Sequence, residues 1–178
     1  NNGASSAGAV FVLAGTSKFR RCHFFDNSSH WGGGAIRQAE EAALQVDSCT
    51  FEANRTDQRG AAIQCGGSES LIVNSTFSGN MTKLRQGGAV LASGCNTRID
   101  HCTFTGNRGS AITMLHSAGQ PVLPRPKLTV TNSILFGNTD CKGEDPLDLY
   151  EEHKIDCVVS GNIVGVDPTG VSKGDSNL

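Results

Sequence analysis

The chain has 178 residues, a length typical of one domain, and a formal net charge of −2. The near-neutral charge, with no basic cluster and no series of stacking aromatic residues, argues against nucleic-acid binding. No apolar run approaches the ~20 residues that a membrane-spanning helix needs. Glycine is abundant (22 residues), proline is scarce (5 residues) and helical periodicity is almost absent, so the composition favours short strands and tight corners.

The first ten residues, NNGASSAGAV, lack the charged and apolar regions of a signal peptide. They are typical of a turn that leads into a coil of a repeat structure. We therefore expect the chain to be processed or to continue a longer protein, with an N-terminal coil that is open to further stacking.

One pattern then recurs along the chain: a glycine-rich opening, a short apolar strand and a closing asparagine. It is clearest in Gly87–Asn107 and is repeated in Gly33–Asn54 and Gly60–Asn80, with weaker copies before and after. The closing asparagines are separated by 27, 26, 27 and 31 residues. A regular period in this range predicts a solenoid of stacked coils.

Each position of the repeat holds one kind of residue. The closing positions are Asn27, Asn54, Asn80, Asn107 and Asn138. Three positions earlier lie Phe24, Phe51, Phe77, Phe104 and Leu135. Such columns indicate coils stacked at the strand spacing of ~4.8 Å, with like residues in contact. We interpret both columns as structural ladders, in which each asparagine adopts the left-handed conformation at a corner and bonds along the axis.

The paired motifs GGA-[I/V] and F-x-x-N resemble the polymorphic outer membrane protein repeat of bacterial surface proteins. The resemblance covers about residues 7–138 and implies an all-β fold, a right-handed single-stranded parallel β-helix of the pectin-lyase-like type. We expect about five coils of ~27 residues within residues 1–138. Residues 139–178 lose the period and are expected to form an irregular capping tail over the last coil.

Seven cysteines are a high and odd number, and none has the spacing of a zinc site, so we expect no metal. An oxidising, extracellular setting is the better interpretation. We expect one disulfide between Cys141 and Cys157, which flank an acidic loop, and another between Cys65 and Cys95 in adjacent coils. The small inward residues of one column are interpreted as buried groups. This column contains Cys22, Cys49, Ser75, Cys102 and Ser133.

Candidates for chemistry are sparse. Asp100 and His101 are weak catalytic candidates, because adjacent strand residues point to opposite sides unless a bend intervenes. Asp47 and Asp100 lie two coils apart with Val73 between them, too far for a shared metal ion. We therefore expect no metal and no cofactor. A column of threonines suggests an ice-binding array, but the column beside it is irregular and does not support that idea.

Four N-x-S/T sequons begin at Asn27, Asn54, Asn74 and Asn80. Three of them are ladder asparagines, whose amide groups should be occupied by stacking. Asn74 is expected to point outward and is the predicted glycosylation site for a eukaryotic source.

The sequence predicts a non-catalytic, extracellular or cell-surface β-helix module that serves in adhesion, surface display or assembly. Its expected partners are neighbouring β-helix coils of the same longer chain, other surface or filament subunits, and glycans. The alternative is a carbohydrate-active β-helix, a lyase, epimerase or hydrolase fragment with a lateral sugar-binding groove. A cluster of carboxylates or a Lys/Arg pair across adjacent coils would favour that enzyme, and the sequence alone reveals neither.

Overall fold

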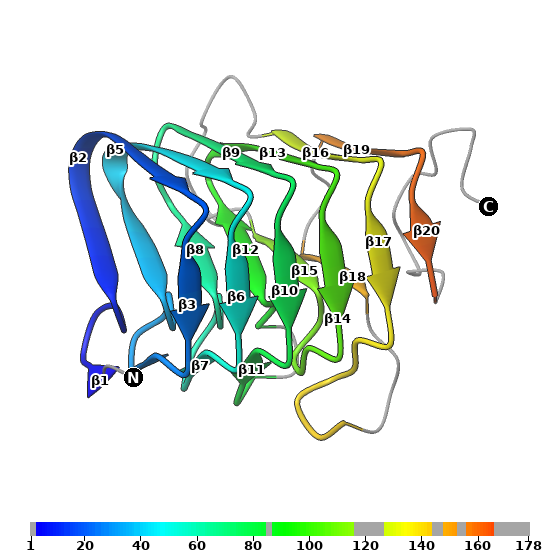
Figure 1. Cartoon of the computed structure of the whole chain (residues 1–178), viewed down its shortest axis with the longest axis horizontal. Coiled ribbons are helices and arrows are strands. Elements are labelled where there is room, and N and C mark those ends of the chain that lie inside the picture. The colour runs from blue at the N-terminus through cyan, green and yellow to red at the C-terminus, as the bar shows by residue number, and fades with distance from the viewer. Residues whose placement is uncertain (1–2, 85–86, 116–126, 144–147, 153–155, 166–178) are drawn as a thin grey trace.

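The computed structural model describes residues 3–84, 87–115, 127–143, 148–152 and 156–165 (Figure 1). Within these residues the chain winds into a parallel β-solenoid with three sheets along its sides and no helix. Sheet A has four short strands, β1 (Gly3–Ala4), β4 (Ser28–Ser29), β7 (Arg55–Thr56) and β11 (Met81–Thr82). Sheet C has six strands, β3 (His23–Phe25), β6 (Thr50–Glu52), β10 (Thr76–Ser78), β14 (Thr103–Thr105), β17 (Ile134–Phe136) and β20 (Ile163–Val164).

Sheet B is the largest and consists of two wings joined by two long strands. The joining strands are β2 (Val10–Arg20) and β5 (Ile36–Asp47). The first wing contains β8 (Ile63–Cys65), β12 (Val90–Ser93), β15 (Ile112–Leu115) and β18 (Leu149–Glu152). The second wing contains β9 (Glu69–Val73), β13 (Asn96–Asp100), β16 (Lys127–Thr131) and β19 (Asp156–Ser160). The six stacked strands of sheet C are separated by five turns, so the predicted β-solenoid of about five turns is confirmed.

The expected irregular tail is wrong for part of residues 139–178. Strand β18 pairs with β15, β19 with β16 and β20 with β17, all in parallel register. The cause is that Leu149 and Val159 continue the inward apolar columns of Ile112 and Val130, and both are buried. The acidic residues between Thr139 and His153 hide this pattern in the sequence. Residues 166–178 lie outside the described residues.

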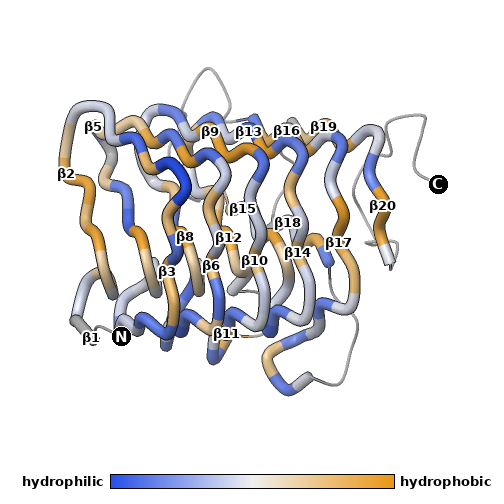
Figure 2. The backbone as a smooth tube through the Cα atoms, viewed as in Figure 1, coloured by the Kyte–Doolittle hydropathy of each residue, from blue (hydrophilic) through white to orange (hydrophobic). Residues whose placement is uncertain are grey.

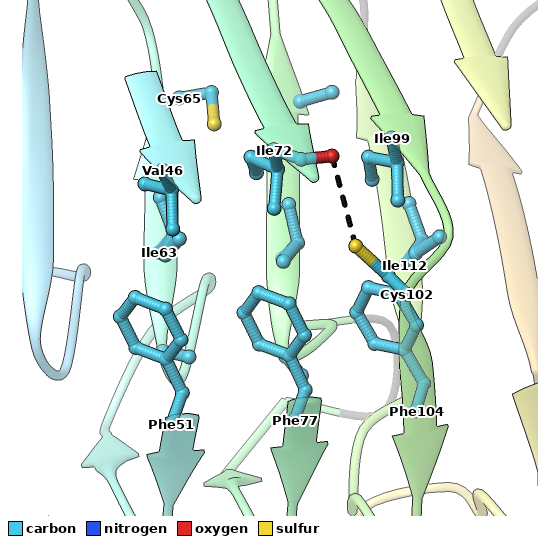
Figure 3. Close-up of a cluster of buried hydrophobic side chains, with 14 of the residues drawn as sticks. Val46, Phe51, Ile63, Cys65, Ile72, Phe77, Ile99, Cys102, Phe104 and Ile112 are labelled. Carbon is cyan, nitrogen blue, oxygen red and sulfur yellow. Dashed lines mark hydrogen bonds between the residues drawn. The ribbon is translucent and has the colours of Figure 1, made fainter. Parts of the chain in front are cut away.

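The core is built from the predicted columns (Figure 3). The rings of Phe24, Phe51, Phe77 and Phe104 stack with centroids 4.8, 4.9 and 4.5 Å apart and nearly parallel planes. Leu135 continues the column and is buried. Each aromatic contact contributes about 0.5–1.5 kcal/mol beyond the burial of apolar area.

Two corners of each coil are made by single residues with positive φ. The corner between sheets B and C falls at Arg21, Ser48, Asn74, His101, Asn132 and Gly161. The corner after sheet C falls at Asp26, Ala53, Gly79, Gly106 and Gly137. The left-handed residue at the second corner therefore precedes the closing asparagine, and the expectation that the asparagine itself is left-handed is wrong. The displaced corner leaves the asparagine side chain pointing into the core.

Candidate functional site

The closing asparagines form a continuous hydrogen-bonded ladder through the interior. From Asn27 to Asn138, each Nδ2 donates to Oδ1 of the asparagine in the next coil, at 2.9, 3.0, 2.9 and 2.8 Å. The same Oδ1 atoms accept the backbone N–H of the preceding asparagine at 3.0–3.1 Å. Asn138 Nδ2 ends the ladder by donating to Asp148 Oδ1 at 2.7 Å. Because these amide groups bond to one another in the interior, the ladder is a structural element rather than a binding site.

Three of the sequons arise because a ladder asparagine is followed, two residues later, by a buried serine or threonine. Their first residues, Asn27, Asn54 and Asn80, are at most 4% exposed. Their third residues form a second buried column, in which Ser29 Oγ donates to Thr56 Oγ1 at 3.2 Å. The fourth sequon differs, because Asn74 is exposed at a corner and its Nδ2 donates to Asp47 Oδ1 at 3.1 Å.

The column of small inward residues, which we call the Ser/Cys/Asn column, forms another ladder that the sequence did not reveal. Its hydroxyl members donate to the carbonyl two residues earlier, as Ser75 Oγ does to Val73 O at 2.7 Å. They also accept a backbone N–H from the preceding coil, as Ser75 Oγ does from Cys49 at 3.1 Å. Asn162 continues the column, and its Oδ1 accepts the Ser133 N–H at 2.8 Å. These side chains therefore hold the corner between sheets B and C.

The thiols in this column also lie near the carbonyl two residues earlier, over longer distances, and they contact a second carbonyl in the preceding coil. Cys102 Sγ lies 3.4 Å from the Asp100 carbonyl and 3.6 Å from the Ile72 carbonyl (Figure 3). Burial raises the pKa of Cys102 to about 11 and also raises the pKa of Cys49. Both thiols are therefore neutral at physiological pH and unsuited to nucleophilic chemistry.

All seven cysteines lie within the described residues, and none of them forms a disulfide. Cys95 Sγ lies 3.5 Å from the Cys65 carbonyl oxygen and 3.2 Å from Thr97 Oγ1, so the residues of this expected pair are adjacent but are not bonded to each other. Cys157 lies in β19 and packs against the core, whereas Cys141 follows the bridge between Arg108 and Thr139 that extends sheet A. The second expected pair therefore belongs to different sides of the coil.

Asp100 and His101 do come together, because the positive φ of His101 supplies the required bend. His101 Nδ1 lies 3.1 Å from Asp100 Oδ1. The carboxylate also accepts hydrogen bonds from Thr131 Oγ1 at 2.7 Å, Asn132 Nδ2 at 2.9 Å and Arg98 Nη2 at 3.1 Å. Burial raises the pKa of Asp100, but the hydrogen bonds from Thr131, Asn132 and Arg98 outweigh it and hold the pKa at about 2. Such a carboxylate is a weak base, and we interpret it as a clamp between coils.

The same clamp occurs two coils earlier at Asp47. Its Oδ1 accepts hydrogen bonds from Asn74 Nδ2 and Ser48 Oγ, and these two bonds lower its pKa. Arg20 Nε lies 3.4 Å from Oδ2. In both clamps an aspartate before the corner bonds to an asparagine at the corner of the next coil. An Asp followed one period later by a corner Asn is the sequence signal for this contact.

A groove of about 380 Å³ lies over sheet B, across the joining strand β5 and the second-wing strands β9, β13 and β16. Its polar lining includes Gln45, Glu69, Asn96, Arg98 and Lys127, and Glu69 is its one carboxylate. Arg98 and Lys127 lie on adjacent strands, and the Lys127 N–H donates to Asn96 Oδ1 at 3.0 Å. The structure thus contains an Arg/Lys pair across adjacent coils that was not apparent from the sequence.

The described residues contain no group of three His, Cys, Asp or Glu side chains arranged to hold a metal ion. In the same part of the chain, no helix is long and apolar enough to cross a membrane.

Stacked parallel strands, interior ladders and left-handed corners define a parallel β-solenoid. A family model described as a right handed beta helix region matches residues 1–170, and the chain belongs to this family. No curated protein and no solved structure matches the chain. The family fixes the fold and leaves the function to be argued from the surface of the solenoid.

Proposed function

We propose that the chain is a non-catalytic structural and adhesive β-helix module, located outside the cell or at its surface. The observation that carries this proposal is that the repeated polar residues of the chain bond to one another between coils. The asparagine ladder, the Ser/Cys/Asn column and the two aspartate clamps all link one coil to the next. The only acid–base pair suggested by the sequence, Asp100 with His101, belongs to one of these clamps.

The cellular location rests on the resemblance to the polymorphic outer membrane protein repeat, and that finer family assignment is part of the proposal. A rod of stacked coils suits display, because its length grows with coil number while its lateral faces stay available. Neighbouring coils of the same longer chain and other surface or filament subunits are the proposed partners. Asn74, exposed at its corner, is the proposed glycan attachment site in a eukaryotic host.

A second candidate function is supported by the groove over sheet B. Two cations, Arg98 and Lys127, line it together with amide groups and a single carboxylate. This lining suits an oligosaccharide that carries carboxylate groups, because arginine and lysine both bind carboxylates. A carbohydrate-active β-helix with a lateral sugar-binding groove therefore remains the alternative.

A turnover screen distinguishes the two functions. The purified chain is incubated with acidic and neutral polysaccharides, and new reducing ends and unsaturated-uronate absorbance are followed. Retention on the same immobilised glycans is measured in parallel. The groove variants are Lys127→Ala and Arg98→Ala, of which Arg98→Ala also removes a hydrogen bond from the Asp100 clamp. The clamp variants are Asp100→Ala and His101→Ala, and Lys83→Ala is the control outside the groove.

We expect no turnover with any polysaccharide. Retention that is lost in the groove variants and kept in Lys83→Ala would assign a glycan-binding adhesive role to the groove. Turnover that is lost in the groove or clamp variants would replace the structural proposal with the carbohydrate-active one.

A further inference from the structure

Exposed large hydrophobic side chains are confined to the two ends of the solenoid within the described residues. Four lie in residues 10–31 and four in the last two coils. They are Phe11, Leu13, Phe25, Trp31, Ile134, Phe136, Val158 and Ile163. Figure 2 shows hydrophobic segments in β2 at one end and in β17 and β20 at the other. Because exposed apolar surface that is confined to a region marks an interaction site, both ends are candidate interfaces.

The two ends also differ in charge. Residues 3–27 contain three cationic residues, Lys18, Arg20 and Arg21, and one carboxylate, Asp26. The described residues of the segment 139–165 contain five carboxylates and one lysine. The small formal charge of −2 therefore hides a separation of charge along the solenoid axis. Opposite charges at opposite ends favour contact between unlike ends and disfavour contact between like ends.

Both ends present edges of parallel sheet. Among the described residues, β2 at one end pairs only with β5, and β3 pairs only with β6. At the other end, in the part of the chain that the structure describes, β19 pairs only with β16, and β20 pairs only with β17 (Figure 1). An edge strand carries a row of backbone donors and acceptors that can pair with a further strand.

The residues that pairing of these edges would bring side by side are of the same type. If β3 of a second copy paired with β20 in the register that β17 uses, Phe24 would lie beside Val164 in the inward aromatic column. In the same arrangement, Phe19 would lie beside Val159 in the inward column of sheet B. Inward apolar columns would therefore run through the junction without a polar residue between them.

The outward side of sheet C adds an aromatic contact. Phe25 of the second copy would lie beside Gly165, the residue that follows β20. A Cβ atom on Gly165 would be only 2.8 Å from Phe136 Cδ2, so the Phe136 ring occupies the space beside this glycine. Phe25 would then contact the Phe136 ring, and two side chains that are 51% and 62% exposed would cover each other.

We propose that the chain associates head to tail, with the first coil of one copy added to the last coil of another. The junction consists of β2 on β19 and β3 on β20. It does not include the asparagine ladder, which ends at Asp148. The interface is heterologous, because it joins two different surfaces, so its repetition produces linear chains rather than closed dimers.

The test measures mass by sedimentation velocity of the full chain over a wide range of concentration. Phe25→Asp places a charge at the first-coil end, and Ile163→Asp places one at the last-coil end. Both side chains are more than half exposed, so the variants should fold. Ser78→Asp is the matched control, because Ser78 shares the outward column of Phe25 but lies in a middle coil.

We expect the unmodified chain and Ser78→Asp to grow beyond dimers as concentration rises, and to dissociate as salt screens the charges. Each end variant alone should be monomeric, and an equimolar mixture of the two should form dimers and nothing larger. A monomeric unmodified chain would overturn the proposal, as would an end variant that dimerises alone, since like ends would then be in contact.

This inference rests on the structural role proposed above and names its partner as a second copy. The two proposals have separate readouts, because association is read as mass in the absence of any polysaccharide. A monomer without turnover would remove the head-to-tail contact and leave the structural role. Turnover by a chain that associates would remove the structural role and leave the head-to-tail contact.

Discussion

Asn54 Nδ2 donates to Asn80 Oδ1 at 3.0 Å, and the same oxygen accepts the Asn54 backbone N–H at 3.0 Å. Asn80 in turn donates from Nδ2 to Asn107 Oδ1 at 2.9 Å and to the Phe51 carbonyl at 3.0 Å. One buried side chain thus connects three successive coils. Its removal leaves donors and acceptors without partners on both sides of the coil.

Asn80→Ala should lower the free energy of unfolding by about 4 kcal/mol, because each unsatisfied buried polar group costs about 1–3 kcal/mol. Urea denaturation followed by far-UV circular dichroism measures the loss. The control is Ser78→Ala in the same coil, where the side chain belongs to the outward column of sheet C, and the expected loss is below about 1 kcal/mol. Equal losses in the two variants would show that the ladder does not hold the coils together.

The Ser/Cys/Asn column predicts that a buried cysteine is replaced better by serine than by alanine. Cys102 occupies the position of Ser75 and Ser133, and Cys102 N–H donates to Ser133 Oγ at 3.1 Å. Cys102→Ser should change the free energy of unfolding by less than about 1 kcal/mol, whereas Cys102→Ala should cost about 1–2 kcal/mol through lost hydrogen bonds. The urea midpoints of the two variants show which of them is more stable. A more stable alanine variant would mean that the column acts by apolar packing alone.

The clamp at Asp100 predicts a loss of stability at low pH. Its pKa is held at about 2, below the ordinary value of 3.8, so the folded state binds this proton less readily than the unfolded state. The clamp therefore contributes its full stabilisation above pH 3.8, and the contribution disappears as pH falls through about 2. Urea midpoints measured across this window should fall less steeply in Asp100→Asn than in the unmodified chain. Identical slopes would exclude Asp100 as a source of acid sensitivity.

The columns of Phe51 and Asn54 could be predicted from the sequence because a solenoid places residues one period apart in contact. The period alone therefore fixes which side chains meet. The same logic did not extend to the clamps and the groove. Asp100 contacts Asn132 because of a left-handed corner, and Arg98 and Lys127 line the same groove because of where β16 begins. Neither backbone feature follows from hydrophobic periodicity.

The misassigned tail and the absent disulfides have a related cause. Leu149 and Val159 keep the register of the inward columns, but charged residues surround them and obscure the period. Spacing in the sequence also does not tell which side of a coil a cysteine occupies, so it could not separate Cys141 from Cys157.

The aromatic stack predicts a strong contrast between two phenylalanines. Phe77 is fully buried between Phe51 and Phe104, whereas Phe25 is 51% exposed on the outer face of sheet C. Phe77→Ala should lower the free energy of unfolding by about 3–5 kcal/mol, the cost of a large core cavity. Phe25→Ala should cost less than about 1 kcal/mol in the monomer. Urea unfolding at low protein concentration provides the comparison, and a similar loss in both variants would contradict the stacked core.

The exposed corner at Asn74 predicts where a eukaryotic secretory host attaches a glycan. Asn74 is exposed, while Asn27, Asn54 and Asn80 have their amides bonded within the ladder. Secreted, folded protein should therefore carry one N-linked glycan, which glycosidase treatment removes and the substitution Asn74→Gln abolishes. Peptide mapping should show the three ladder asparagines unmodified. A glycan on Asn54 of folded protein would contradict the structure, because its Nδ2 lies between the Phe24 carbonyl at 2.9 Å and Asn80 Oδ1 at 3.0 Å.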